Sequence, residues 1–112
     1  MDERVLALLY DVKSACERTE RFVEGKTLGN YLSDELLRSA VERQFVIMGE
    51  ALSRASRIMP ELEENITDFK KIVGLRNILV HGYAVVEDEV IWGIVETYVG
   101  KLKKEAETLL KK

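Results

Sequence analysis

Apolar residues recur every three or four positions along most of this chain, a spacing that places side chains on one side of an α-helix. The pattern predicts a first helix over residues 2–24, which Gly25 ends, and then a loop over 26–32. The apolar positions of this helix are Val5, Leu8, Leu9, Val12, Ala15, Cys16, Phe22 and Val23. A single amphipathic helix therefore opens the chain.

A second and longer helix is predicted from Ser33, which we interpret as its N-cap, to about Met59, where Pro60 discourages continuation. Two apolar faces follow from the spacing: Leu37, Val41, Phe45, Met48, Leu52, Ala55 and Met59 on one, and Leu36, Ala40, Ile47, Ala51 and Ile58 on the other. A helix that is apolar on two sides usually contacts neighbours on both. The second face is therefore a candidate contact with another copy of the chain. An acidic linker, with at most a turn of helix, follows over 61–65.

Two more helices complete the pattern. Thr67 is a plausible cap for a third, shorter helix over 68–81. Gly82 should end it, because glycine readily adopts the left-handed conformation found at helix C-termini. A short extended link then leads to a fourth helix, whose first turn is acidic at 87–89 and so complements the helix dipole.

Four helices with mostly short connections predict an all-α fold, an antiparallel four-helix bundle whose shorter third helix packs across one end. The chain has 112 residues, which suits one domain over 1–112. Cys16 is the only cysteine, so we interpret it as a small buried hydrophobe. No stretch approaches the roughly 18 uncharged apolar residues of a membrane span, and the N-terminus does not resemble a signal peptide. We therefore expect a cytoplasmic protein without membrane association.

Arg76 interrupts the apolar stripe of the third helix, four residues after Ile72 and four before Val80. A guanidinium in such a stripe is costly unless it is paired or faces an opening. One interpretation is a structural arginine, salt-bridged to Glu50 or Glu42 on the second helix. The other is a phosphate ligand, since the guanidinium is a planar fork of donors that keeps its charge when partly desolvated.

His81 is the only histidine of the chain, and it stands directly before Gly82. It can be a capping or packing residue, or a group that transfers protons near neutral pH. Tyr83 can pack back on the helix or use its hydroxyl toward a ligand. Ideal helical geometry leaves Arg76 and His81 roughly 140° apart, so they share a cleft only if the long arginine reaches around.

The motif R-x-x-x-x-H-x-Y at the end of the third helix of a small bundle resembles the HEPN superfamily, and in particular the HepT toxins. Residues 75–83 (LRNILVHGY) are similar to the family core R-N-x-L-x-H-x-Y. Residues 41–43 (VER) and 48–51 (MGEA) resemble its I-E-R and I-G-E-A segments, and 90–92 (VIW) the start of its last helix. Asp68-Phe69 departs from the usual Pro-Trp, although a phenylalanine can fill that core position.

The resemblance implies metal-independent cleavage of RNA without a cofactor. Arg76 would orient and neutralise the scissile phosphate, and His81 would move the proton of the attacking 2′-hydroxyl or of the leaving group. Asn77 would add a hydrogen bond or hold the arginine, and Glu50 would support it. Internal attack of this kind would leave a cyclic phosphate.

Acid–base cleavage of RNA uses one group to take a proton and another to give one, and this chain has a single histidine. A homodimer, or a higher even oligomer, would supply two histidines and two arginines to one cleft. HEPN ribonucleases resemble this picture. The net charge of −3 does not attract RNA. A local basic patch would have to do so, and the candidates are Lys70, Lys71, Arg54 and Arg57, which could equally be a solvated surface.

The resemblance also implies a partner, an MNT-type minimal nucleotidyltransferase antitoxin that transfers AMP to the motif tyrosine, here Tyr83. Added phosphates beside Arg76 would occupy the site meant for the substrate. Two alternatives stay open. One is a non-catalytic module that binds a nucleotide or the nucleotidyltransferase, and the other is a structural adaptor in which a fully buried Arg76 bonds Glu50. One histidine and one cysteine do not make a zinc site.

Overall fold

Long amphipathic helices make up most of the protein, and their packing confirms the predicted all-α bundle. A computed structural model describes residues 1–82 and 84–112, and within these ranges every regular element is a helix. The helices are α1 (Glu3–Val23), α2 (Leu28–Ser33), α3 (Glu35–Ile58), α4 (Leu62–Asn65), α5 (Phe69–His81) and α6 (Asp88–Leu110). Helices α1, α3, α5 and α6 correspond to the four predicted, α4 is the turn of helix considered for the linker over 61–65, and α2 is a short addition.

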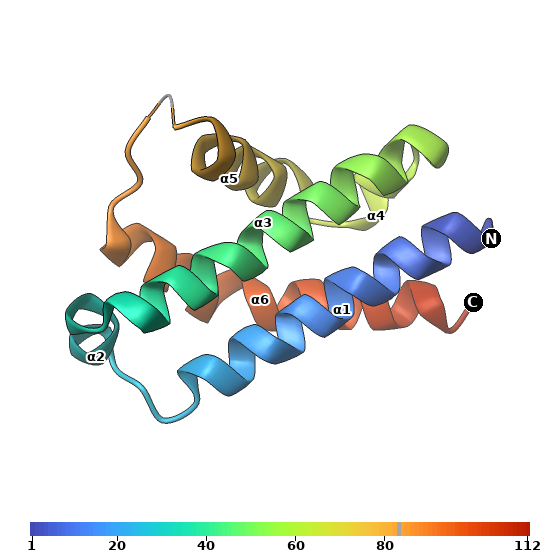
Figure 1. The fold of residues 1–112 in the computed structure, drawn as a ribbon. Helices are drawn as coiled ribbons and strands as arrows, with labels where there is room; N and C mark the ends of the chain where they lie inside the picture. Colours follow the sequence, from blue (N-terminus) through green and yellow to red (C-terminus); the bar gives the residue numbers. More distant parts are fainter. Residues whose placement is uncertain (83) are drawn as a thin grey trace.

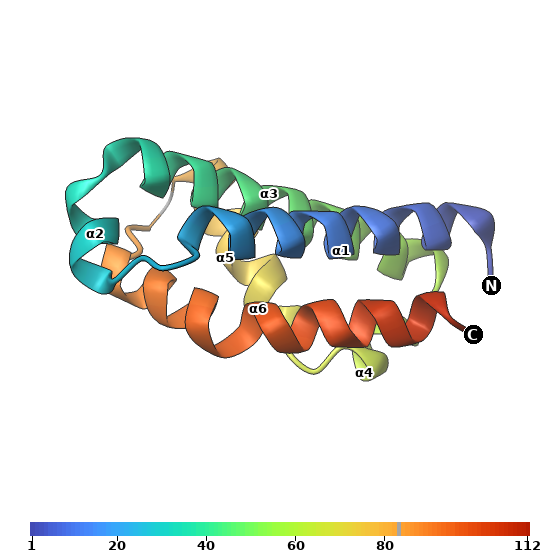
Figure 2. The same ribbon diagram turned by 90° about the horizontal axis from the view of Figure 1, so that it is seen from below.

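The long helices α1, α3 and α6 run along the length of the molecule, with α1 against both of the others (Figures 1 and 2). Helix α5 packs against α3, on the side away from α1 (Figure 2). The two chain termini lie at one end of the bundle, and the connection from α5 to α6 lies toward the other (Figure 1). The end of α5 is thus held away from the termini.

Helix α1 supplies the centre of the core, because its apolar positions follow the helical repeat closely. Val5, Leu9, Val12 and Cys16 are fully buried. Burial raises the pKa of the Cys16 thiol to about 12, so it stays neutral, and the nearby Glu20 carboxylate acts in the same direction. The interpretation of Cys16 as a buried hydrophobe is confirmed.

The predicted loop over 26–32 is wrong, because it contains the short helix α2. Thr27 and Asn30 form a reciprocal capping box at its start: the Thr27 hydroxyl accepts a hydrogen bond from Asn30 N at 3.1 Å, and Thr27 N donates to Asn30 Oδ1 at 2.9 Å. Asparagine in place of the usual Glu or Gln hides this start signal in the sequence.

Two predicted helix caps are also wrong. Ser33 ends α2, and Asp34 is the N-cap of α3, where its carboxylate accepts from Leu37 N at 3.1 Å. Thr67 does not cap α5; its hydroxyl donates to Glu105 of α6 at 2.6 Å. Asp34 thus takes the capping position that the sequence pattern assigns to Ser33, and Glu105 binds the Thr67 hydroxyl that the pattern assigns to the start of α5.

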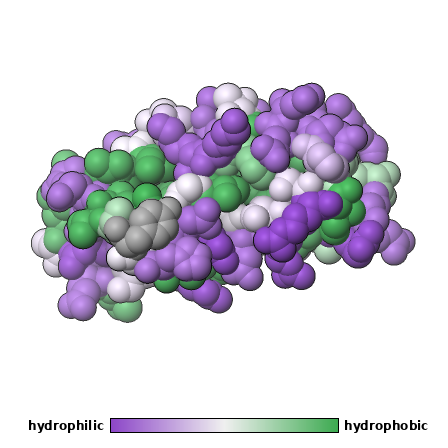
Figure 3. Space-filling view, turned by 90° about the horizontal axis from the view of Figure 1, so that it is seen from above, coloured by the Kyte–Doolittle hydropathy of each residue, from purple (hydrophilic) through white to green (hydrophobic). Residues whose placement is uncertain are grey.

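Large hydrophobic side chains remain exposed where α5 ends. Val80 and Val85 are 47% and 90% exposed, and Leu36 and Val90, in the first turns of α3 and α6, are 80% and 53% exposed. Figure 3 shows hydrophobic residues gathered at this end of the face that α5 forms. A patch of this kind commonly marks an interaction surface.

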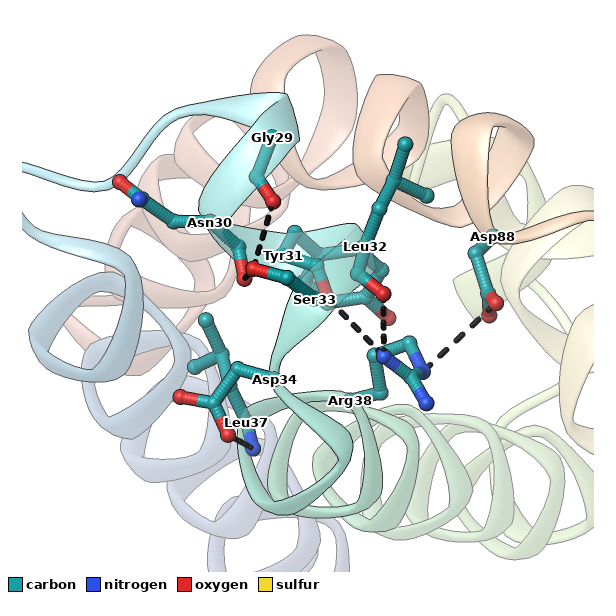
Figure 4. A network of polar contacts seen from close by, with 9 residues as sticks. All are labelled: Gly29, Asn30, Tyr31, Leu32, Ser33, Asp34, Leu37, Arg38 and Asp88. Carbon is teal, nitrogen blue, oxygen red and sulfur yellow. Dashed lines mark hydrogen bonds and ion pairs between the residues drawn. The ribbon is translucent and has the colours of Figure 1, made fainter.

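Arg38 of α3 contacts both the end of α2 and the start of α6 (Figure 4). Its Nη1 donates to the backbone oxygens of Leu32 at 2.6 Å and Tyr31 at 3.4 Å, where α2 ends. Its Nε lies 3.6 Å from Asp88 Oδ2 in the first turn of α6. The cation thus satisfies orphan carbonyls of α2 and holds the start of α6, which fixes where the chain returns after the motif.

Tyr31 is the largest fully buried side chain, and its ring lies 5.3 Å from that of Trp92. Its hydroxyl makes no hydrogen bond to any described residue. Burial raises the pKa of the Tyr31 phenol far above its usual range, and the carboxylates of Glu42 and Asp88 add to this. The hydroxyl is therefore a neutral, buried and unsatisfied group, which is unfavourable to the folded state.

Helices α3 and α5 cross at Gly49, where there is no room for a side chain. A Cβ at this position would collide with Arg76 Cβ, would come within 2.9 Å of Arg76 Cγ and would lie 3.1 Å from the backbone oxygen of Ile72. The glycine therefore allows the close approach that seats Arg76 against α3.

We predict that Tyr31→Phe stabilises the protein. Removing an unsatisfied buried hydroxyl should raise the free energy of unfolding by about 1 kcal/mol, and hence Tm by roughly 4 °C, as measured by circular dichroism. Tyr10→Phe is the matched control, since Tyr10 is 60% exposed, and it should leave Tm unchanged. A lower Tm for Tyr31→Phe would contradict the prediction.

We predict that Gly49→Ala destabilises the protein by about 1–3 kcal/mol in urea unfolding, because the methyl group overpacks the crossing of α3 and α5. Gly93→Ala is the control, since a Cβ at that position in α6 meets nothing within 4 Å. That variant should be as stable as the wild type or more so. Equal stabilities for Gly49→Ala and the wild type would show that the crossing relaxes without strain.

Candidate active site

The register of α5 places the motif residues on two sides of the helix. Ile72 and Leu75 are buried and define the side that faces the core. Arg76 lies at the flank of this side, against α3, and is about a quarter exposed. Asn77 is half-buried and His81 is exposed. The motif is thus neither sealed in the core nor fully in solvent.

Two side chains hold the Arg76 guanidinium. Its Nη1 donates to Asn77 Oδ1 at 2.9 Å, and its Nη2 lies 3.9 Å from Glu50 Oε2 on α3. Its Nε is buried and makes no hydrogen bond to a described residue. The ion pair is long and the Glu50 side chain is half exposed, so the cation is positioned but only weakly neutralised.

These contacts bear on both interpretations of Arg76. The pair with Glu50 is the one that the structural interpretation predicts, whereas a fully buried Arg76, which the adaptor hypothesis requires, is not observed. The other proposed partner, Glu42, lies near Arg38 and Asp88, and burial together with the Asp88 carboxylate raises the pKa of Glu42. Arg76, Asn77 and Glu50 are therefore brought together, and Glu42 belongs to the cluster around Arg38.

His81 is the last residue of α5, and the chain turns directly after it. Gly82 has a φ of 65° in the left-handed region, and its N–H donates to the backbone oxygen of Ile78 at 2.8 Å. The predicted end of the helix at Gly82 is confirmed. Tyr83, the predicted AMP acceptor, lies outside the described residues. The roles assigned to His81 and Tyr83 stay predictions.

The predicted RNA-binding residues are all exposed, and they lie in two places. Arg54 and Arg57 line a groove of about 540 Å³ between α1 and α3. Arg54 also borders a smaller groove of about 150 Å³ that reaches Glu50, the partner of Arg76. Lys70 and Lys71 lie on α5, where Lys71 Nζ is 4.9 Å from the centre of the Tyr98 ring. The arginines therefore border the grooves between α1 and α3, where only Arg54 shares a groove with Glu50, and Lys71 lies beside α6.

Gly49 is the residue of the site to which sequence analysis assigned no role. A glycine in the interior of a long helix is unfavourable, by about 1 kcal/mol relative to alanine, and so signals a close approach of backbone. The sequence alone does not say which helix approaches.

Two further features of the described residues bear on chemistry and location. Within 1–82 and 84–112, no three His, Cys, Asp or Glu side chains cluster as metal ligands would. Among the same residues, no helix has both the length and the apolar composition that a membrane crossing requires.

Comparison with known proteins identifies a family and several relatives. A family model described as "Ribonuclease HepT-like" matches residues 12–109. The chain is 34% identical over 103 residues to a protein of Methanocaldococcus jannaschii named "Putative RNase MJ1380", covering 92% of this chain and 94% of the relative. It is 29% identical over 103 residues to the "Probable ribonuclease HepT" of Thermococcus cleftensis, covering 92% and 93%.

No solved structure matches the chain at a significant level. The family model spans nearly the whole chain, from α1 to the end of α6, and so includes both α3 and the motif helix α5. The protein therefore belongs to the ribonuclease HepT-like family.

Proposed function

We propose that this protein is a metal-independent endoribonuclease that acts as a toxin, with its site at the interface of a homodimer or a higher even oligomer. The observation that carries the proposal is the environment of Arg76. Asn77 and Glu50 position its guanidinium, which is partly desolvated and only weakly neutralised, and Arg76 lies on the helix that ends in His81. The names of the relatives support an RNA substrate.

The proposed chemistry uses the side chains of α5. Arg76 binds the scissile phosphate and stabilises the charge that develops on it. The 2′-hydroxyl attacks this phosphorus while His81 takes its proton or protonates the departing 5′-oxygen, so that a 2′,3′-cyclic phosphate and a free 5′-hydroxyl result. Asn77 accepts a hydrogen bond from the guanidinium and so fixes its direction.

A second copy of the chain completes the proposed site. One imidazole cannot be both proton acceptor and proton donor in the same step, and the chain has one histidine. A two-fold dimer would bring two imidazoles and two guanidiniums together. The exposed hydrophobic residues around the end of α5, including Val80 and Val85, are the surface on which we place this contact.

Local charge would attract RNA despite the net charge of −3. The exposed candidates for this attraction are Arg54 and Arg57 in the groove between α1 and α3, and Lys70 and Lys71 on α5. Asp11 shares the groove with these arginines, and Glu50 borders the smaller groove beside Arg54, so acidic side chains partly offset the positive charge there.

Regulation by a nucleotidyltransferase is part of the proposal because the family resemblance implies it, and the charge of Arg76 would explain how it works. A cognate MNT-type antitoxin would transfer AMP to Tyr83, two residues after His81. The added phosphates would compete with RNA for Arg76. A non-catalytic module would bind the same partner without turnover, so cleavage assays separate the two functions.

We predict that Arg76→Ala and His81→Ala each lower the rate of RNA cleavage by a factor of about 10²–10⁴, while circular dichroism shows an unchanged helical fold. The measurement is cleavage of labelled total RNA by purified protein, with EDTA present to test metal independence. A wild-type dimer that cleaves no RNA, and is harmless to cells without its partner, would contradict the proposal.

The variants also test the shared site. Mixing Arg76→Ala with His81→Ala after subunit exchange makes a heterodimer with one arginine and one histidine in its cleft. A composite site should then recover the part of the activity that one imidazole supports when water completes the second proton transfer, which neither variant has alone. No recovery in proven heterodimers would mean either that each site lies within one subunit or that both imidazoles are required.

We predict that co-expression with the nucleotidyltransferase encoded beside it adds one or more AMP groups to the protein, and that the modified protein loses cleavage because the phosphates pair with Arg76. Intact-mass spectrometry measures the addition. Tyr83→Phe should remain unmodified and fully toxic. An unchanged mass, or modification of Tyr83→Phe at the same level, would exclude Tyr83 as the acceptor.

A further inference from the structure

The outward side of α5 carries a stripe of residues spaced by four, three and four positions. These are Lys70, Gly74, Asn77 and His81. At 3.6 residues per turn they fall within roughly 60° of one another, over about 16 Å of helix. Lys70 and His81 are exposed, and Gly74 and Asn77 are partly exposed. The apolar residues that pack on α3 lie on the opposite side.

Among the described residues, none gives a structural reason for a glycine at position 74. It lies in the interior of α5, where glycine is unfavourable relative to alanine. Its φ is not in the left-handed region, and a Cβ added there would meet nothing within 4 Å. This contrasts with Gly49, which Arg76 contacts directly. The absence of a side chain at Gly74 therefore leaves room for a ligand outside the chain to lie close to the backbone of α5.

We infer that Gly74 is a positioning residue for the substrate, and that it lets the sugar–phosphate backbone of RNA lie directly against α5 between Lys70 and His81. The inference rests on the proposed ribonuclease function and adds a place for the strand beyond the scissile phosphate. Lys70 would bind a flanking phosphate, and the Asn77 amide, whose oxygen accepts from Arg76, would turn its nitrogen to the strand.

The chemistry of the stripe favours RNA over a second copy of the chain at this place. Lys70, Asn77 and His81 all offer hydrogen-bond donors, and the stripe has neither a carboxylate nor an apolar side chain. Two Lys70 ammonium groups facing each other across a two-fold axis would repel, whereas a polyanion complements them. The exposed apolar residues at the end of α5 suit the contact between copies better.

The test compares Gly74→Ala with Gly100→Ala in the full-length protein. Gly100 lies in α6, and a Cβ there also meets nothing within 4 Å. Both variants should raise Tm by roughly 4–8 °C, because alanine favours the helix. The probe is a labelled single-stranded RNA whose 2′-hydroxyls are replaced by fluorine, so that binding is measured without cleavage.

We expect Gly74→Ala to weaken binding of this probe, and to lower kcat/KM on unmodified RNA, by at least tenfold, while Gly100→Ala matches the wild type. A Gly74→Ala variant that binds and cleaves like the wild type overturns the inference alone. The inference is also overturned if Gly74→Ala loses binding and light scattering shows a changed oligomeric mass. The glycine would then serve the contact between two copies of the chain. A wild type that neither binds nor cleaves RNA overturns the proposed function first, and this inference with it.

Discussion

The close approach of α5 to α3 at Gly49 is the contact on which the site depends. A helix pair separated by ordinary side chains would leave Arg76 either in solvent or in the core. With no Cβ on α3 at this point, the Cβ and Cγ of Arg76 lie against bare helix backbone, and the guanidinium emerges beside Glu50 and Asn77. The arginine is thus fixed by packing of its stem rather than by a strong ion pair.

That arrangement decides what the cation can do. A short, fully buried pair with Glu50 would neutralise the charge and leave little for a ligand. At 3.9 Å, with half of the Glu50 side chain exposed, the attraction is weak and screened. The buried Nε without a partner indicates that the protein alone does not satisfy the guanidinium. An anion that binds from solvent therefore finds the hydrogen-bond donors of the Arg76 guanidinium already oriented.

Much of the fold could be predicted from the sequence, and the predictions that were wrong have identifiable physical reasons. The long helices follow from the apolar spacing, and the end of α5 follows from Gly82. The cap at Thr67 fails because Thr67 binds Glu105 on α6, a contact that only the tertiary structure makes, whereas Asp34 replaces Ser33 through a local bond to Leu37 N. The pairing of Arg76 with Glu50 rather than Glu42 was open, since both glutamates lie beside apolar positions of one helix.

Helix α5 departs from the local rules that the rest of the bundle obeys. It has no side-chain cap at its start, because Asp68 pairs with Lys101 of α6 at 3.3 Å. Its interior contains Gly74, which no contact with a described residue requires, and its core flank carries a partly desolvated cation. Each feature lowers the stability of the helix, and α3 compensates by packing along it. Helix α1, by contrast, follows the local rules throughout. Selection for a functional site, rather than for stability, produces unfavourable features of this kind on a single helix.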